Sequence, residues 1–177
     1  LLLMESRTSV RRITSHLLEQ GRTLPGFIGD IGYAQSNRER YEGFCQALTD
    51  AGKKVDSSLC LTTPLGIDTY REEIDTFLSS LSRMPDAFVC ASDYVACILM
   101  QLLEKRGLRV PEDVAVSGFD NNTEDLLAEH LTTVQVFNEE LGARLALQIL
   151  YRIKYPNTPH EITYLGTNVL YRDSTGD

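Results

Sequence analysis

Short apolar runs alternate with amphipathic helical stretches along most of the chain, and this alternation constrains the fold more than any other feature. The clearest run is Ala87–Ala91, which reads AFVCA and has no polar member. An uninterrupted apolar run is typical of a strand buried on both faces, as the inner strands of a parallel sheet are. A strand–helix order repeated over about 130 residues therefore predicts right-handed βαβ units and a doubly wound parallel sheet of the α/β class.

The expected elements follow from the hydrophobic periods. Helices are predicted over Arg7–Gln20, Asn37–Asp50, Thr69–Ser82, Tyr94–Arg106, Thr123–His130 and Glu139–Tyr155. Strands are predicted over Leu24–Gly29, Val55–Leu61, Ala87–Ala91, Val114–Phe119 and Thr132–Phe137, with a last extended segment at Ile162–Tyr171. The helix after Ala91 has the cleanest stripe of apolar residues, with Ser92 or Asp93 available to cap its start.

Composition narrows the class of protein. The chain has 177 residues, of which 42% are hydrophobic and 24% charged, values that are typical of a soluble globular protein of one domain or two small lobes. These values exclude a disordered tail, a collagen-like repeat and a small disulfide scaffold. No apolar run approaches the length of about 18 residues that a membrane span needs. Leu1–Met4 is too short and lacks the basic flank of a signal peptide.

The charge is distributed unevenly. The formal net charge is −8, and residues 61–177 carry an excess of nine acidic groups. An acidic surface cannot provide the basic face that a phosphate backbone requires. We therefore expect that this segment does not itself bind nucleic acid.

The cysteines and histidines do not form a metal-binding or redox pattern. None of the cysteines forms a CxxC pair, and the histidines are scattered: Cys45, Cys60, Cys90, Cys97; His16, His130, His160. We expect free thiols in a reducing cytoplasm and no metal. The glycines of Gly26–Gly32 lack the order of a dinucleotide fingerprint, so no cofactor is predicted.

Ligands of open parallel sheets bind beyond the carboxyl ends of the strands, so the residues there are the candidates for a site. They are nearly all polar, which suits a small polar ligand: Asp30–Ser36, Thr62–Gly66, Ser92–Asp93, Asp120–Asn122 and Phe137–Asn138. Three acids at strand ends could hold Mg²⁺, but Asp93 also suits a helix cap and Asp120 a backbone turn. Arg40 is either a solvated surface arginine or a fork of donors that points into the crevice.

Catalytic motifs are not visible. The chain has no GxSxG elbow, no HExxH pair and no histidine near a strand-end nucleophile. We therefore expect a binding protein and not an enzyme.

One stretch resembles a known family. Phe88–Asn121 holds a strand, then Ser92-Asp93, an apolar helix, Arg106-Gly107, the run VPEDV at 110–114, and Gly118-Phe119-Asp120. This order and spacing resemble the effector-binding core of the LacI/GalR (lactose/galactose repressor) family of bacterial transcription regulators.

Three further stretches agree with the resemblance, which spans nearly the whole chain. They are the RYEGF run from Arg40 followed by Ala47-Leu48 and Ala51-Gly52, the LTTV run at 131–134 followed by Glu140-Leu141-Gly142, and the closing Tyr171-Arg172-Asp173-Ser174, with Asp where the family has Glu.

The resemblance implies a periplasmic-binding-protein-like fold of type I, present here as its C-terminal lobe with the first lobe mostly absent. Residues 5–137 and 160–172 would form the C-lobe, and residues 138–156 a helix that returns to the N-lobe. Leu1–Met4 would be the last N-lobe strand, without its sheet, and the stripe Leu141, Leu145 and Ile149 would lack some of its partners.

The resemblance also assigns ligand-binding residues. Arg40 matches the arginine that forks onto the effector, and Asp120 the acid that accepts ligand hydroxyl or NH donors. Ser92, Ser36 and Asn138 complete the expected set. Asn138 stands where several members have an aromatic, and Pro64 where some have a stacking aromatic, which weakens the case for a stacked sugar ring.

The implied function is that of an effector-sensing domain. A sugar or nucleobase-like effector would bridge two lobes and change how a cytoplasmic homodimer presents its DNA-binding heads, which belong to a helix-turn-helix outside this chain. The alternative is a periplasmic-type solute-binding protein for uptake of a sugar or related molecule. Sequence upstream of Leu1 would separate the two.

Overall fold

The computed structural model describes residues 1–66, 68–122 and 129–177, and its centre is a four-stranded parallel sheet. The strand order is β3-β2-β4-β5, with bounds β2 Pro25–Ile28, β3 Cys60–Leu61, β4 Ala87–Cys90 and β5 Ala115–Ser117. The predicted doubly wound parallel sheet is confirmed. The expected helix Thr123–His130 lies mostly outside the described residues.

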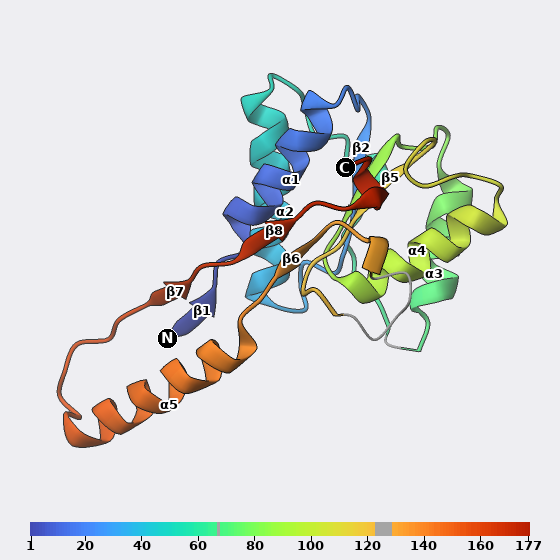
Figure 1. The fold of residues 1–177 in the computed structure, drawn as a ribbon. Coiled ribbons are helices and arrows are strands. Elements are labelled where there is room, and N and C mark those ends of the chain that lie inside the picture. The colour runs from blue at the N-terminus through green and yellow to red at the C-terminus, as the bar shows by residue number, and fades with distance from the viewer. Residues whose placement is uncertain (67, 123–128) are drawn as a thin grey trace.

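Helices cover both faces of this sheet (Figure 1). Their bounds are α1 Arg7–Glu19, α2 Gln35–Asp50, α3 Tyr70–Ser80, α4 Asp93–Lys105 and α5 Asn138–Lys154. Successive side chains of a strand point to opposite faces, so Phe88 and Cys90 pack with α3 and α4, whereas Ala87 and Val89 pack with α1 and α2. The sheet is therefore buried on both sides, as its apolar strands predict.

Helix α4 follows the local rules of the sequence. The Ser92 side chain accepts a hydrogen bond from the backbone nitrogen of Val95 at 3.3 Å and caps the helix start. Gly107 lies at φ +73° just past the end, in the left-handed region that favours glycine. The cap expected at Ser92 or Asp93 is thus provided by Ser92.

The strand after β5 does not simply extend the parallel sheet. It is β6, Thr133–Gln135, which meets the sheet edge only through isolated parallel bridges, one of them between Ser117 and Thr132. Its regular pairing is antiparallel, to β8, Asn168–Leu170. The expected fifth parallel strand is therefore one half of a two-stranded antiparallel ribbon.

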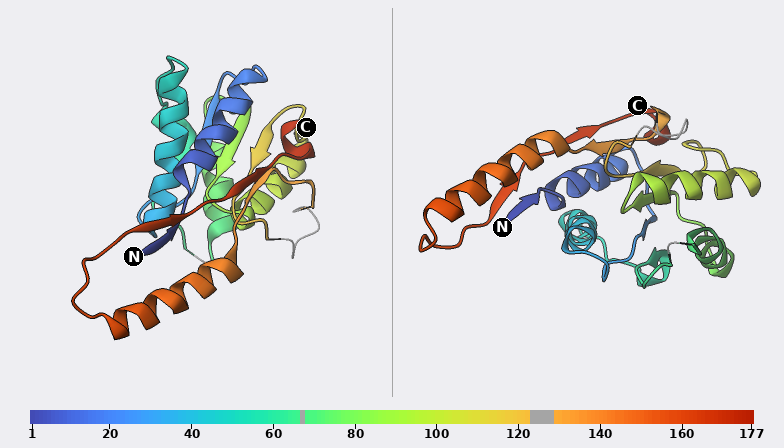
Figure 2. Two further views of the ribbon diagram at one scale, coloured as in Figure 1. Left: turned by 60° about the vertical axis from the view of Figure 1, so that its left-hand side comes forward. Right: turned by 90° about the horizontal axis from the view of Figure 1, so that it is seen from below.

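Helix α5 projects from the sheet body together with the short strands β1, Leu2–Met4, and β7, Thr163–Leu165 (Figure 2). These three elements are called the arm below. Strand β1 pairs in parallel with β7, in a two-stranded sheet that is separate from the four-stranded sheet. The pairing aligns Leu2 with Thr163, a contact between chain segments that periodicity alone does not reveal.

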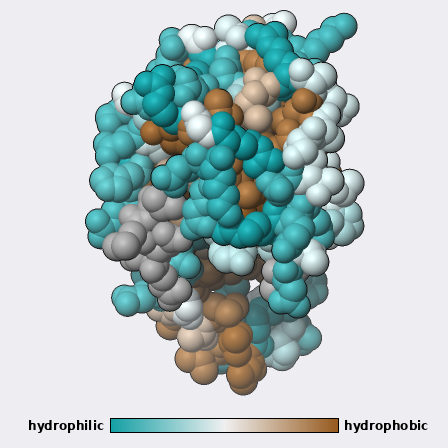
Figure 3. All heavy atoms as spheres, turned by 90° about the vertical axis from the view of Figure 1, so that its right-hand side faces the viewer, coloured by the Kyte–Doolittle hydropathy of each residue, from teal (hydrophilic) through white to brown (hydrophobic). Residues whose placement is uncertain are grey.

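The arm is apolar and exposed. No residue of α5 is buried, and its large side chains face solvent, among them Leu145, Leu147, Ile149, Leu150 and Ile153. Figure 3 shows hydrophobic surface gathered at the lower end of the molecule, the end at which α5 lies in Figure 1. An exposed apolar helix face of this kind marks an interaction surface.

Two smaller differences concern local structure. The predicted strand Val55–Leu61 is shorter, because Asp56 accepts hydrogen bonds from Ser58 and turns Ser57–Leu59 into a 3₁₀ helix before β3. The four cysteines are free, with Cys90 and Cys97 buried and the other two half-buried. Within the described residues, no helix is both long and apolar enough to cross a bilayer.

Candidate functional site

The candidate site lies where the strand order reverses. Strand β2 has β3 on one side and β4 on the other, and the chain winds away from it in both directions. The residues after β2 and β4 therefore flank the crevice in which α/β sheets of this type bind ligands. After β2, the Asp30 carboxylate accepts hydrogen bonds from the backbone nitrogens of Gly32 and Tyr33 and shapes the loop that leads into α2.

Arg40 spans this point from the second turn of α2. Its side chain is 6% exposed, so Arg40 is not the solvated surface arginine of the first interpretation. Its guanidinium is also too deeply buried to project freely from the sheet. One terminal nitrogen donates to the backbone oxygen of Ala91 at the end of β4, and the other donates to Oδ1 of Asp120 at 3.3 Å. The guanidinium carbon lies 3.6 Å from the centre of the Phe119 ring, a cation–π contact. Burial lowers the pKa of Arg40, and the neighbouring carboxylates oppose that effect.

Asp120 presents its carboxylate at the edge of the site. Its side chain is 39% exposed, so it remains accessible beside the buried Arg40. Burial raises the pKa of Asp120, and Arg40 acts in the opposite direction. The backbone of Asp120 lies at φ +109° and that of Asn121 at φ +51°, conformations that L-residues rarely adopt. The Asx-rich turn is therefore real, and it also places the carboxylate against Arg40.

Asp93 has a role that the sequence did not indicate. It is 2% exposed, and its carboxylate does not cap α4 but accepts from Oγ1 of Thr133 at 2.6 Å and from the backbone nitrogen of Asn122 at 2.7 Å. Burial raises its pKa to about 6, while those two hydrogen bonds act to lower it. Asp93 thus stabilises the loop that carries Asp120, through its hydrogen bond with the backbone of Asn122.

The other predicted site residues are placed differently. Ser92 is half-buried and caps α4, Ser36 is half-buried in the first turn of α2, and Asn138 is exposed at the start of α5. The hydrogen bonds of the described residues join Arg40 to Asp120 but join neither of them to these three. Asn138 lines an open hollow of about 650 Å³ together with Gln135–Phe137, Glu139, Glu140 and Ala143.

The sequence placed Asn121 among the strand-end candidates but missed its partners. Asn121 bonds to Arg172 and Gln135, and Thr133, which was also missed, bonds to Asp93. One signal was available in Gly118: a Cβ there would come within 2.2 Å of Oδ1 of Asp93, so only glycine fits. A glycine two residues before a strand-end acid indicates close packing, although it does not name the neighbour.

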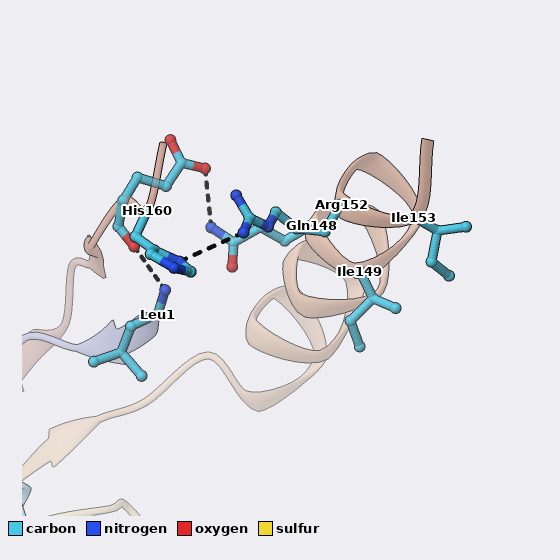
Figure 4. A pocket seen from close by; sticks show the side chains of 7 residues that line it. Leu1, Gln148, Ile149, Arg152, Ile153 and His160 are labelled. Carbon is cyan, nitrogen blue, oxygen red and sulfur yellow. Dashed lines mark hydrogen bonds between the residues drawn. The ribbon is translucent and has the colours of Figure 1, made fainter. Parts of the chain in front are cut away.

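A second hollow lies in the arm. It has a volume of about 330 Å³, and Figure 4 shows Leu1, Gln148, Ile149, Arg152, Ile153 and His160 around it; Glu161 completes the lining. Its polar rim is tied together, since Gln148 donates to Glu161 at 3.1 Å and the amino group of Leu1 donates to the backbone oxygen of Glu161. It contains none of the predicted site residues.

The chemistry of the site is that of polar recognition. Arg40 offers buried donors, Asp120 offers an accessible acceptor, and the Phe119 ring lies beneath the guanidinium. In the part of the chain that the structure describes, no group of three or more His, Cys, Asp or Glu side chains is arranged to hold a metal ion. The arrangement suits a small neutral or polar molecule with hydroxyl or NH groups.

The parallel sheet and the helices on its two faces define one class of protein: a periplasmic-binding-protein-like α/β lobe. The family model described as periplasmic binding protein-like domain matches residues 14–175. The chain belongs to this family, in its LacI/GalR branch.

Individual proteins similar to this chain are transcription regulators of the same family. The transcriptional regulator DegA of Bacillus subtilis is 35% identical over 130 residues, which cover 72% of this chain and 38% of DegA. A LacI-family regulator structure from Sanguibacter keddieii has a TM-score of 0.82 at 27% identity, covering 99% of this chain and 66% of that one. The structure of the regulator CelR with cellobiose has a TM-score of 0.87 at 28% identity, covering 98% and 53%. The chain spans less than half the length of the curated relatives it matches.

Proposed function

We propose that this chain is the effector-sensing part of a DNA-binding transcription regulator, and that a small polar molecule bound at its crevice controls operator binding allosterically. The observation that carries the proposal is the meeting of Arg40 and Asp120 at the switch point, 80 residues apart in sequence. The relatives, which are transcription regulators, support this reading over solute uptake and over catalysis.

In this proposal the ligand is a sugar or a nucleobase-like molecule. Asp120 accepts hydrogen bonds from its hydroxyl or NH groups, and Arg40 fixes the carboxylate in place. Ser92, Ser36 and Asn138 contribute further polar contacts. A sugar is supported by the CelR–cellobiose complex among the structural relatives. Neither a metal nor a cofactor takes part.

The domain division is also a proposal. Residues 5–137 and 160–172 form one lobe, and residues 138–156 pack against a second lobe, so that the effector lies between the two. The exposed apolar face of α5 supports this division, because water-exposed Leu145, Ile149 and Ile153 gain burial in such packing. Strand β7 lies inside the segment 160–172, which the proposal gives to the C-lobe, yet it pairs with β1, which the proposal gives to the N-lobe. The β1–β7 pair would therefore connect the two lobes.

We further propose that the intact regulator is a cytoplasmic homodimer that contacts DNA through a helix-turn-helix outside this chain. The acidic excess of residues 61–177 supports a DNA-binding surface elsewhere. Light scattering of the intact protein gives the oligomeric state, and a monomer at all concentrations contradicts this part.

The test of the site uses the intact protein and a panel of cellobiose, ribose and hypoxanthine. Thermal shift finds the ligand, and calorimetry compares the wild type with Asp120→Asn, which keeps the side-chain shape and tolerates the positive φ. A lost hydrogen bond to a charged group costs about 1.5–3 kcal/mol, so affinity falls roughly 10- to 150-fold.

The matched control is Asp113→Asn, which neutralises a carboxylate paired with Arg109 on the surface. We expect this variant to bind like the wild type. Equal affinity of Asp120→Asn and the wild type would refute the assignment of the site.

A further inference from the structure

The turn that carries Asp120 has an unfavourable backbone shape, which the neighbouring Asn121 side chain helps to hold. Asp120 and Asn121 both have positive φ, at +109° and +51°. Asn tolerates the left-handed region better than most residues, yet two successive residues there need tertiary contacts to persist. The contacts of Asn121 supply them.

Asn121 is bonded in three directions. Its side-chain nitrogen donates to Oε1 of Gln135 at 2.6 Å, and its side-chain oxygen accepts from a terminal nitrogen of Arg172 at 2.8 Å. Its backbone nitrogen donates to Oγ1 of Thr133 at 3.2 Å, the same hydroxyl that donates to Asp93. The amide is therefore used on both its donor and its acceptor side.

These partners belong to the two strands that lead out to the arm. Thr133 and Gln135 begin and end β6, which is followed by α5 after two residues. Arg172 follows β8, and β8 is preceded by β7. Figure 1 shows β6 and β8 side by side between the sheet body and the arm, and their antiparallel register confirms the contact.

A second contact strengthens the link. Asp120 and Gln135 form an isolated parallel bridge, and the backbone nitrogen of Asp120 donates to the oxygen of Val134 at 3.1 Å. Asp120 and its neighbour Asn121 therefore both bind strand β6. A displacement of Asp120 would act on β6 through these backbone contacts, and on the segment after β8 through the bond between Asn121 and Arg172.

We propose that Asn121 is a positioning residue for Asp120 and links the effector site to strands β6 and β8, which lead out to the arm. This inference rests on the proposed function. An effector that pulls Asp120 toward it acts through Asn121 on Gln135 and Arg172. The displacement then reaches β6 and β8, the two strands that set the orientation of the arm. The link can transmit only the difference in the effector's affinity for the two orientations.

Two variants test it in the intact protein. Asn121→Gly keeps the positive φ available and deletes the amide, and Asn121→Asp keeps the acceptor for Arg172 but removes the donor to Gln135. The control is Asn168→Ala, an exposed asparagine on β8 itself. Amide hydrogen exchange reports on the strands, and carboxyl NMR titration gives the pKa of Asp120. Neither measurement needs an effector.

For Asn121→Gly we expect exchange about tenfold faster in both β6 and β8 with β2 and β4 unchanged. The pKa of Asp120 then moves down toward its ordinary value, because the loosened carboxylate is hydrated. Asn121→Asp loosens β6 alone, and Asn168→Ala leaves the pKa of Asp120 unchanged.

An unchanged pKa of Asp120 in Asn121→Gly would show that the amide only stabilises the fold, and this overturns the positioning role. Unchanged exchange in β6 and β8 overturns the link. If none of cellobiose, ribose and hypoxanthine binds the wild type, the proposed function loses support while these two measurements still decide the inference.

Discussion

The pairing of Arg40 with Asp120 makes a quantitative prediction through a double-mutant cycle of Arg40→Met and Asp120→Asn. Two unit charges about 4 Å apart interact by roughly 4 kcal/mol at an effective dielectric constant of 20. The Asp120 side chain is 39% exposed, so solvent screens the pair, and we take about half of that value. The expected coupling free energy at pH 7 is therefore about 2 kcal/mol.

The assay is urea denaturation of the wild type, both single variants and the double variant, from which the coupling is the departure from additivity. Methionine keeps an unbranched apolar stem but loses the guanidinium contact with the Phe119 ring. That loss is common to the Arg40→Met single variant and the double variant, so it cancels in the cycle. The matched control is the same cycle on Arg109 and Asp113, an exposed ion pair in the turn before β5, for which about 0.2–1 kcal/mol is expected.

A coupling for the Arg40–Asp120 pair no larger than that of the exposed pair would refute the reasoning, because it would mean that solvent screens the buried guanidinium as fully as a surface one. The sign has an independent check. Arg40 lowers the pKa of Asp120, so Arg40→Met raises that pKa further above the ordinary value, as NMR titration of the single variant measures.

Three further predictions follow from the packing around the site. The native pKa of Asp93, about 6, lies above its unfolded value of about 3.9, so the native state binds the extra proton. Stability therefore falls by roughly 2–3 kcal/mol as pH rises from about 4 to about 6; urea denaturation measures this slope, and an equally steep slope in Asp93→Asn contradicts it. Gly118→Ala places a Cβ 3.0 Å from the Cα of Asp93 and 2.2 Å from its carboxylate. We expect it to lower the free energy of unfolding by about 1–3 kcal/mol or more in the same assay. A denaturation midpoint equal to that of the wild type would show that the turn relaxes around the added methyl group. Ser92→Ala removes the cap of α4 and costs about 1 kcal/mol, unlike the exposed control Ser82→Ala; equal midpoints of the two variants rule out a capping contribution.

Local patterns determined most of the sheet body. The apolar run at Ala87–Ala91 becomes β4, buried on both faces, and the stripe that includes Val95, Leu99 and Leu103 becomes the buried face of α4. These elements are predictable because their burial repeats with the period of their own backbone. The strand-end rule and the family resemblance together also selected Arg40 and Asp120, and the structure brings these two side chains into contact.

The site's supporting residues were not predictable in the same way. Asp93 looks like a helix cap from its position, and only the fold shows that its carboxylate turns to Thr133 and Asn122. Asn121 looks like a turn residue, and only the fold brings Arg172 to it from 51 residues away. A buried polar group must find a partner, but the chain does not state which distant segment supplies it.

The same division holds for the strands. The sequence by itself predicted that Thr132–Phe137 and Ile162–Tyr171 are extended, and β6, β7 and β8 lie within these ranges. Only the tertiary structure decided that β6 pairs with β8 and that β1 pairs with β7. Strand pairing depends on backbone hydrogen bonds between segments far apart in the chain, and those bonds are nearly independent of side-chain identity. Periodicity therefore reports which face of a segment is buried, whereas the partner is chosen by the fold as a whole.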